Sequence, residues 1–333
     1  MDVYTSTYGH FNGTKYPPNL RLCRLKTYGV VWGMNPLANT FGKIVDGDYD
    51  IVHVHSYVFF MSNTAAMARA FDEFKYILNF HGGIDYTNDN SLSMKLWAKD
   101  KLYDPTLGRM TVGLADKVIS ICRKDIPAIR DKFGVTAEYV PNAVCTDTFD
   151  YKETNDDTVV FVGKLERWKG AQDLIDIFQR VKRACPSTRF KVVGEGSLQK
   201  DLAATKLPID FSGYIHHENM PQIYHNASVS ILPSYMEGSP TTCIEAGSCG
   251  VPVVATDVGD TKEIVKNGVS GFIFKPGDKE GMANAIINLL DKRSKRREMG
   301  LCAREHITNH FSYDAIANQM AGIYASVASG TAR

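Results

Sequence analysis

Short apolar runs alternate with stretches of helical periodicity along most of the chain. In the first half, apolar runs bounded by polar or glycine residues predict strands at 2–6, 20–25, 51–55, 76–80, 117–121 and 138–140. Apolar residues spaced by three or four predict helices at 61–74, 91–113 and 124–132. This alternation of strand and helix predicts a parallel sheet.

The second half repeats the alternation with a clearer pattern. Strands are predicted at 158–162, 189–193, 209–212, 228–232, 251–255 and 271–274. Helices are predicted around the apolar series Leu174, Ile177, Phe178 and Val181, and at 278–290, 293–309 and 312–328. Residues 141–144 contain a proline and separate the two halves. The sequence therefore predicts two α/β domains, the second of them doubly wound.

The composition is ordinary for a globular protein and argues against several classes of function. With 333 residues, 44% hydrophobic and 23% charged, the chain is long enough for two domains with buried cores. A formal net charge of +1 argues against nucleic-acid binding. No apolar run is long enough for a spanning helix and the first residues lack the pattern of a signal peptide, so we expect a cytoplasmic protein. The 7 cysteines are scattered, so neither a disulfide framework nor a zinc site is predicted.

Candidate chemistry concentrates in residues 234–256, where a predicted helix start is followed by a buried strand. Ser239 and Pro240 have the pattern of an N-cap and a first helical residue. The amides of Thr241 and Thr242 would then lack helical acceptors. The positive end of such a helix is suited to an anion such as phosphate.

Two carboxylates lie on either side of this helix start. Glu237 precedes it, and Glu245 lies about two turns inside the helix, so both can face one ligand from different depths. Carboxylates accept hydrogen bonds from hydroxyl-rich ligands such as a sugar or a ribose. The plain alternative is a pair of surface glutamates on a helix-capping loop.

Two lysines follow the predicted strand 158–162. Lys164 comes directly after Gly163, and Lys169 lies five residues further on. Because ligands bind at the carboxyl ends of the strands in open α/β folds, both ammonium groups are candidates for binding a ligand. The alternative is a solvated basic loop.

Glycines and a histidine follow other predicted strands. Gly194 and Gly196 come after strand 189–193, where they would let a ligand approach the backbone closely. Ile215 follows the end of the next strand. His81 ends strand 76–80, where its ring could bind hydroxyl groups or stabilise a developing charge, unless it is a structural strand-end histidine.

Three further groups of charged or titratable residues have plainer interpretations. His53 and His55 alternate with apolar residues in one strand, so we interpret them as core or interface histidines rather than metal ligands. The two Asp-x-Asp patterns within 46–50 lie in a polar turn, and we interpret them as turn residues. The basic run 292–297 is either the solvated face of a terminal helix or a patch that attracts anionic lipid.

The segment from Glu237 to Glu245 resembles the signature of the family 4 retaining glycosyltransferases. Residues 163–170, Gly-Lys-Leu-Glu-Arg-Trp-Lys-Gly, are similar to the Gly-Arg-Leu segment of that family with its following Lys-Gly. The resemblance covers about residues 45–328, with the motifs in the expected order. It implies the GT-B fold, an α/β fold in which two Rossmann-like doubly wound domains face a cleft.

The resemblance also implies a role for each matched residue. Glu237 would contact the donor sugar and Glu245 the nucleotide ribose, while Lys164 and Lys169 would bind the donor diphosphate. His81 would lie beside the transferred sugar. The implied catalytic residues are His81, Glu237 and Lys169. The implied donor-binding residues are Gly163, Lys164, Lys169, Gly194, Gly196, Ile215, Glu237, Gly238, Ser239, Thr241, Thr242 and Glu245.

Three domain segments follow from the resemblance. They are an acceptor-side domain at 1–144, a nucleotide-sugar-binding domain at 145–310, and a final helix within 311–333 that crosses back to the first domain. The family normally opens with a strand, a Gly-rich turn and a helix before the segment that residues 2–6 resemble. We therefore interpret the first domain as truncated and expect the neighbours of the missing strand to lose backbone partners.

The predicted activity is transfer of a sugar, with retention of configuration, from a nucleoside diphosphate sugar to a hydroxyl group of a glycan, a lipid-linked acceptor or a small molecule. No cofactor or metal is expected, because two lysines and a helix start can stabilise the leaving diphosphate. With a lipid-linked acceptor, the protein could contact the inner face of the cell membrane. Two alternatives stay open: another GT-B enzyme, such as a nucleotide-sugar epimerase or a phosphorylase, and a non-catalytic sugar-nucleotide-binding subunit.

Overall fold

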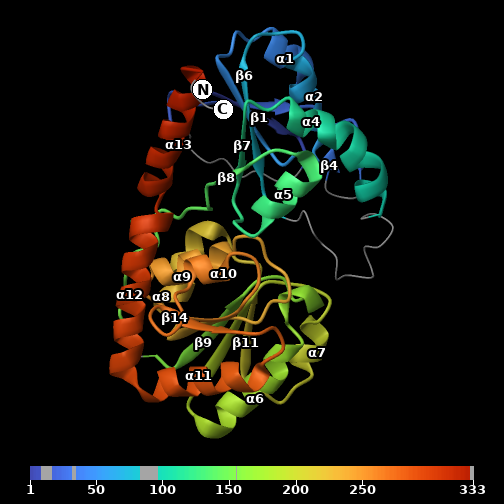
Figure 1. Cartoon of the computed structure of the whole chain (residues 1–333). Helices are drawn as coiled ribbons and strands as arrows, with labels where there is room; N and C mark the ends of the chain where they lie inside the picture. Colours follow the sequence, from blue (N-terminus) through green and yellow to red (C-terminus); the bar gives the residue numbers. More distant parts are fainter. Residues whose placement is uncertain (9–16, 32–34, 83–96, 155, 331–333) are drawn as a thin grey trace. The chain divides into compact units, whose positions relative to one another are not determined.

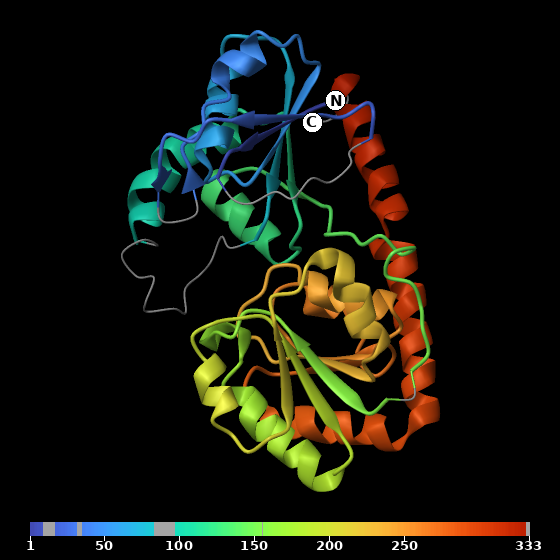
Figure 2. The same ribbon diagram turned by 180° about the vertical axis from the view of Figure 1, so that it is seen from behind.

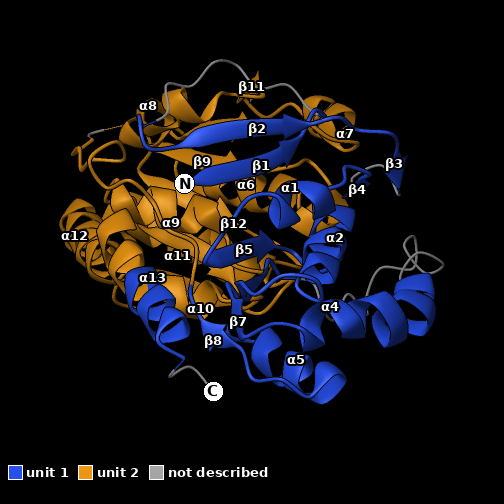
Figure 3. Cartoon of the chain, turned by 90° about the horizontal axis from the view of Figure 1, so that it is seen from above, with its two compact units in different colours: residues 1–140, 320–333 blue, residues 141–319 orange. Residues whose placement is uncertain are grey.

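The computed structural model describes residues 1–8, 17–31, 35–82, 97–154 and 156–330. The chain forms two compact units, which Figure 3 distinguishes by colour. Unit 1 consists of residues 1–140 and 320–333, and unit 2 consists of residues 141–319. Each unit is an α/β arrangement built on parallel sheet, so the predicted fold class is confirmed (Figure 1).

Unit 1 contains a parallel sheet with the strand order β5-β6-β7-β8. Its strands are β5 (Ile51–His55), β6 (Lys75–Phe80), β7 (Lys117–Ser120) and β8 (Glu138–Tyr139). Two short sheets accompany it. Strand β1 (Asp2–Ser6) pairs parallel with β2 (Arg21–Leu25), and β3 (Val30–Val31) pairs antiparallel with β4 (Asn35–Pro36).

Helices cover the apolar side of the β5–β8 sheet. They are α1 (Phe41–Val45), α2 (Phe60–Ala68), the π-helical segment η2 (Lys99–Gly108), α4 (Arg109–Gly113) and α5 (Asp125–Phe133). Tyr76, Leu78 and Phe80 alternate along β6 and belong to the buried cluster that these helices complete. The predicted helix at 91–113 is helical from residue 97, and its first six residues lie outside the described part of the chain.

The sheet structure of unit 1 is divided. Within the described residues, β1 pairs only with β2 and β5 pairs only with β6. The expected truncation of the first domain stays a prediction. A side-chain link joins the two sheets, because the Tyr49 hydroxyl lies 2.6 Å from the Asp2 carboxylate and 2.7 Å from the Tyr4 hydroxyl. The neighbouring Asp48 has a φ of 46°, which confirms that this acidic segment is a turn.

Unit 2 is organised on one parallel sheet with the strand order β11-β10-β9-β12-β13-β14. The strands are β9 (Thr158–Val162), β10 (Arg189–Val193), β11 (Ile209–Gly213), β12 (Val229–Leu232), β13 (Val253–Thr256) and β14 (Gly271–Phe274). They follow the predicted strands closely, and the reversal of strand order between β9 and β12 confirms the doubly wound arrangement.

Alternate residues of β9 face two different cores. Val159 and Phe161 pack with α6 (Asp173–Ala184) and α11 (Lys279–Asp291) on one face of the sheet. Val160 packs on the other face, with α8 (Met220–His225), α9 (Thr241–Ser248) and α12 (Arg293–Phe311). Figure 2 shows the sheet of this unit with helices on both sides. The predicted apolar series of α6 is fully buried.

Short elements complete the chain. They are α7 (Gln199–Ala203), α10 (Thr261–Ile264) and the 3-10 turns η3 (Arg167–Lys169) and η4 (His217–Asn219). The last helix, α13 (Tyr313–Ala328), begins in unit 2, and its residues from Met320 onward belong to unit 1. No helix in the described part of the chain is both long and apolar enough to cross a bilayer.

Candidate functional site

The candidate site lies at the carboxyl ends of β9, β10 and β12 in unit 2. Gly163 directly follows β9, and Gly194 directly follows β10. Gly194 has a φ of 125°, and a Cβ atom built on it would lie 2.0 Å from the Gly163 carbonyl oxygen. A Cβ atom on Gly196 would lie 2.5 Å from the Leu165 carbonyl oxygen. We expected these glycines to admit a ligand, but the group that closely approaches them is the backbone of the chain itself.

Lys169 and Glu237 form an ion pair at this end of the sheet. The Lys169 ammonium lies 2.6 Å from one carboxylate oxygen of Glu237 and 2.8 Å from the other. Only 16% of the Lys169 side chain and 7% of the Glu237 side chain are exposed. Partial burial strengthens such a pair relative to one in open solvent. The structure therefore brings together two predicted site residues that are 68 positions apart in the sequence.

Neighbouring groups hold this pair in place. The Ser234 hydroxyl donates to Glu237 at 2.7 Å, and the Lys169 ammonium lies 4.9 Å from the centre of the Trp168 ring. The backbone amide of Tyr235 donates to the Trp168 carbonyl oxygen at 2.9 Å, which ties the loop after β12 to the loop after β9. Lys164, the other predicted cation, is exposed.

The helix behind Glu237 begins one residue later than predicted. Thr241 is the first residue of α9, and Pro240 occupies the N-cap position with an extended ψ of 104°. The prediction that Ser239 is the N-cap is therefore wrong, and no side-chain hydrogen bond caps the helix. The Ser239 hydroxyl is buried without a partner in the described structure, while its carbonyl oxygen accepts from Asn142 at 3.0 Å. The first amides of α9 remain oriented as an anion site requires.

Glu245 is buried inside α9 and has two partners. The Tyr224 hydroxyl donates to it at 3.0 Å, and His217 lies 3.4 Å from its other oxygen. Burial raises the pKa of Glu245, while the hydrogen bond from Tyr224 opposes that shift. Because Tyr224 is itself fully buried, the carboxylate of Glu245 is held in one position.

Glu245 lines a hollow of about 240 Å³ within unit 2. Thr241 and His217 line the same hollow, together with Ala143, Val144 and Tyr313. The hollow thus connects the start of α9 with the buried carboxylate, and its lining offers a hydroxyl, a carboxylate and an imidazole to a polar ligand. Sequence reasoning missed His217 and Tyr224, although His217 follows the predicted Ile215 by only two residues.

His81 belongs to unit 1, where it lies in a group of three histidines. Its Nε2 atom lies 2.8 Å from Nδ1 of His55, whose ring stacks on His53 with 4.6 Å between centroids. Nδ1 of His53 lies 2.8 Å from the Tyr324 hydroxyl, and its buried Nε2 has no partner in the described structure. We expected both His53 and His55 to be core or interface histidines. His53 is half-buried against Tyr324, whereas His55 and His81 are exposed, so a core position is wrong for His55.

Desolvation keeps these three rings neutral. It lowers the pKa of His53 to about 3, with a further contribution from the charges of His55 and His81. Desolvation and the charge of His55 lower the pKa of His81 to about 4, and desolvation also lowers the pKa of His55. At neutral pH, each ring can therefore both donate and accept a hydrogen bond.

Two known families together match nearly the whole chain. The family described as "Glycosyl transferases group 1" matches residues 147–306, and the family "Glycosyltransferase Family 4" matches residues 1–148. Among curated proteins, a glycogen synthase of Mycobacterium tuberculosis is 30% identical over 182 residues, which are 52% of this chain and 43% of that protein. The sulfoquinovosyl transferase of Arabidopsis thaliana is 31% identical over 152 residues, which are 44% of this chain and 29% of that protein. The chain thus matches less than half the length of these relatives.

Solved structures resemble both halves of the chain. A sucrose-phosphate synthase of Thermosynechococcus elongatus matches with a TM-score of 0.79 and 20% identity, covering 99% of this chain and 89% of that one. The Anabaena protein HepE in complex with UDP matches with a TM-score of 0.72 and 21% identity. The match covers 92% of this chain and 86% of the HepE chain. These similarities show a common GT-B fold.

Proposed function

Because the chain belongs to the family 4 glycosyltransferases, we propose that it transfers a sugar from a nucleoside diphosphate sugar to an acceptor hydroxyl group. The observation that carries this proposal is the Lys169–Glu237 pair at the carboxyl end of the unit 2 sheet, beside the start of α9. This arrangement places three groups in one loop region: a cation, a helix N-terminus, and a carboxylate that can accept hydrogen bonds from sugar hydroxyl groups.

Each of these groups has a part in the proposed reaction. The Lys169 ammonium, Lys164 and the first amides of α9 stabilise the negative charge that grows on the diphosphate as the glycosidic bond breaks. Glu237 accepts hydrogen bonds from hydroxyl groups of the donor sugar, and Ser234 keeps its carboxylate oriented. Glu245 accepts hydrogen bonds from the ribose. The configuration of the sugar is retained, as the family resemblance implies.

We further propose that the donor nucleotide is uridine diphosphate. HepE, a neighbour in fold, has been solved with UDP and with UDP-glucose. The hollow beside Glu245 supports this proposal, because its volume of about 240 Å³ can hold part of a nucleoside. We propose that unit 1, with His81, supplies the acceptor side.

A second candidate function is sugar-nucleotide binding without turnover. The division between β1 and β5 favours it, because the described residues of unit 1 do not form one continuous sheet behind an acceptor site. The two candidates share the donor site of unit 2 and differ only in whether a sugar is released from the nucleotide.

The test is a donor panel in the presence of EDTA. The chain is incubated with uridine, guanosine and adenosine diphosphate sugars, and both the shift in melting temperature and the release of free nucleoside diphosphate are followed. We expect stabilisation and slow release with a uridine donor. Lys169→Gln should weaken donor binding by about tenfold or more, because it removes a charge-assisted contact.

Lys191→Gln is the matched control, because Lys191 is also paired with a carboxylate but lies within β10. It should leave donor binding unchanged. Stabilisation without release, even with acceptor extracts present, would favour the binding subunit. No stabilisation by any donor would contradict both candidates.

A further inference from the structure

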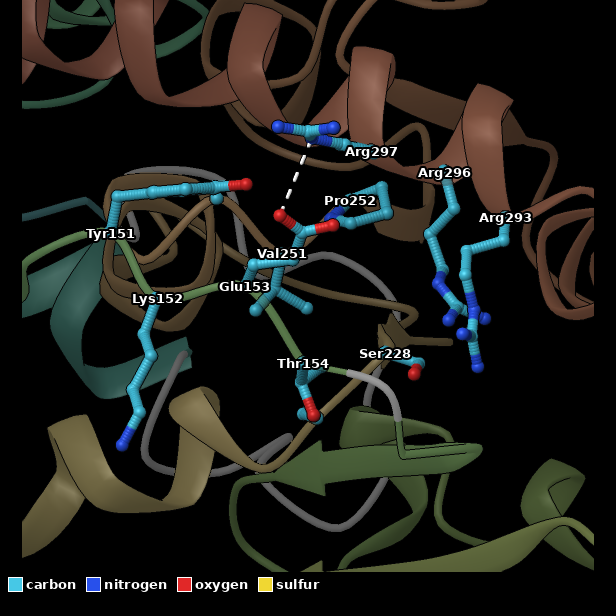
Figure 4. Close-up of a pocket in the computed structure, with 12 residues that line it drawn as sticks. Tyr151, Lys152, Glu153, Thr154, Ser228, Val251, Pro252, Arg293, Arg296 and Arg297 are labelled. Carbon is cyan, nitrogen blue, oxygen red and sulfur yellow. Dashed lines mark ion pairs between the residues drawn. The ribbon is translucent and has the colours of Figure 1, made fainter.

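A second polar hollow lies at the opposite edge of the unit 2 sheet from the donor site. It is lined by residues that precede β9, β12 and β13, among them Thr154 and Ser228, and by the first turns of α12 (Figure 4). Ligands of the proposed transferase bind at the carboxyl ends of these strands, whereas this hollow lies at their amino ends. Five residues of β9 separate the two edges, a span of roughly 16 Å.

Arg296 is the buried cation of this hollow. Only 5% of its side chain is exposed, and its Nη2 atom has no hydrogen-bond partner in the described structure. Nη1 lies 3.4 Å from the Leu289 carbonyl oxygen and 3.6 Å from the nearest oxygen of Asp157, so neither contact is strong. A buried guanidinium stays charged and is costly to leave without a partner. The buried Nη2 atom therefore keeps a hydrogen-bonding capacity that an anion in the hollow could use after a small movement of the side chain.

Further positive charge lies near Arg296. Lys152, Arg293 and Arg297 line the same hollow. In Figure 4 the guanidinium group of Arg293 lies beside that of Arg296, Arg297 points toward Glu153, and the Lys152 side chain points away from the arginines. Desolvation lowers the pKa of Arg296, the charge of Asp157 opposes that shift, and the nearby charge of Arg293 lowers the pKa further. Glu153 lies 3.4 Å from Arg297, and Asp157 lies beside Arg296. Among the described residues that line the hollow, Lys152 and three arginines are cationic and Glu153 is acidic.

The position of these cations on α12 also favours the binding of an anion. The helix has 19 residues, no acidic residue in its first turn and no side chain capping its first amides. Arginines at the positive end of a helix are repelled by the helix dipole. An anion at this position would neutralise the arginines and offset their repulsion by the helix dipole. One of the two predictions for this basic run is a solvated helix face. Arg293, Lys295 and Arg297 are exposed and agree with that prediction, whereas Arg296 is buried and does not.

The volume of the hollow limits the size of the ligand group that it can bind. Its volume is about 30 Å³, room for about two water-sized atoms. Two oxygens of a phosphate group fit this space, whereas a nucleobase or a sugar ring does not. Arginine is also the side chain best suited to bidentate contact with phosphate.

We propose that this hollow binds a phosphate group, either inorganic phosphate or the phosphomonoester end of a larger molecule, at a site separate from the donor site. Arg296 and Arg293 bind its oxygens from one side, and the hydroxyl of Thr154 lines the site. The remainder of a larger ligand stays outside the hollow. This inference does not depend on the proposed transfer reaction.

The test is isothermal titration calorimetry of the full chain with inorganic phosphate in low-salt buffer. All variants carry Lys169→Gln, so that the donor-side lysine does not contribute a second phosphate site. We expect saturable binding that Arg296→Gln weakens by about tenfold or more, since each charge-assisted contact is worth that much. Arg293→Gln should also weaken phosphate binding by about tenfold. Because Arg293 is exposed, this variant replaces Arg296→Gln if that one does not fold.

Lys295→Gln is the matched control. It removes one charge from the same run, but Lys295 lies over the Phe272 ring and does not line the hollow. Phosphate binding that survives this change and fails in Arg296→Gln supports the site. Equal loss in all three variants would show non-specific attraction and would overturn it, as would the absence of phosphate binding in the parent chain.

A second arm of the test distinguishes the sources of the phosphate. The same variants are sedimented with phosphatidylcholine vesicles that contain phosphatidic acid, whose headgroup is a phosphomonoester. Vesicle binding that depends on Arg296 and not on Lys295 assigns a lipid source. Calorimetric binding without vesicle binding assigns a free phosphate compound.

Discussion

The three histidines of unit 1 link β5 and β6 to α13 through short contacts. His81 bonds to His55, His55 stacks on His53, and His53 bonds to Tyr324. All three rings have lowered pKa values, so protonating any of them opposes folding. The stability of the folded chain is therefore sensitive to pH at these residues.

The pH dependence follows from the difference between the folded and unfolded pKa values of these histidines. An unfolded histidine has a pKa of about 6.5, so above that pH both states are neutral and the full stability is present. As the pH falls, the unfolded chain takes up protons first, and stability is lost between pH 6.5 and the folded pKa values of about 4 and about 3. We expect the free energy of unfolding, measured with urea, to decrease from pH 7.5 to pH 5. His53→Asn should flatten that decrease, and an unchanged slope would contradict this account.

Sequence reasoning found single functional residues more readily than their partners. Glu237 and Lys169 were predicted from local motifs, but their ion pair joins loops that are far apart in the sequence. The burial of Glu245 depends on Tyr224, which lies on a different helix. Such pairings depend on tertiary packing, which local patterns do not encode.

At the scale of single elements, α12 packs against the segment that ends α9. A Cβ atom built on Gly300 of α12 would lie 2.0 Å from the Gly250 carbonyl oxygen. Gly250 itself has a φ of 75°, so its backbone has little freedom to move away. The close approach of the two backbones therefore requires a residue without a Cβ atom at position 300.

Gly300→Ala should therefore destabilise the protein, although alanine is the better helix former. We expect the free energy of unfolding to fall by about 1–3 kcal/mol, the usual cost of overpacking. Gly322→Ala is the matched control, because Gly322 lies within α13 and an added Cβ atom would meet no atom within 4 Å. That change should raise the free energy of unfolding by about 0.5–1 kcal/mol. Equal effects of the two changes in urea unfolding would contradict this packing argument.

Elements differ in how well the sequence predicts them. The strands of unit 2 and helix α6 follow from apolar runs and from a clear three-and-four spacing. Short helices such as α1, α7 and α10 were missed, because four or five residues do not show a helical period. The start of α9 was placed one residue early, because the extended ψ of Pro240 follows from its surroundings rather than from residue type.

At the scale of the whole molecule, the two units differ in how their sheets are completed. Unit 2 has one continuous sheet with a buried cluster on each face. The described strands of unit 1 form separate sheets, with β1 and β5 each paired on one side only among those residues. In the described part of the chain, unit 1 has fewer strand pairs and a smaller buried cluster than unit 2, so we expect unit 1 to be the less stable unit.

We therefore expect two transitions in differential scanning calorimetry, with unit 1 unfolding first. If the donor site lies in unit 2 as proposed, UDP should raise the temperature of the second transition by mass action and leave the first nearly unchanged. Hydrogen exchange on the same sample assigns each transition to its unit. A single transition that shifts as a whole with UDP would contradict the independence of the two units.

The division of the chain into units has a consequence for protein engineering. The chain passes between units at residues 140 and 141, and again inside α13 at residues 319 and 320. A cut at the first position leaves one fragment with most of unit 1 and a second fragment with all of unit 2 and the last turns of α13. Unit 1 is thereby divided between the two fragments, and the contact of His53 with Tyr324 connects its parts. The two fragments are therefore suited to fragment complementation, in which the reassembly of unit 1 restores a complete molecule.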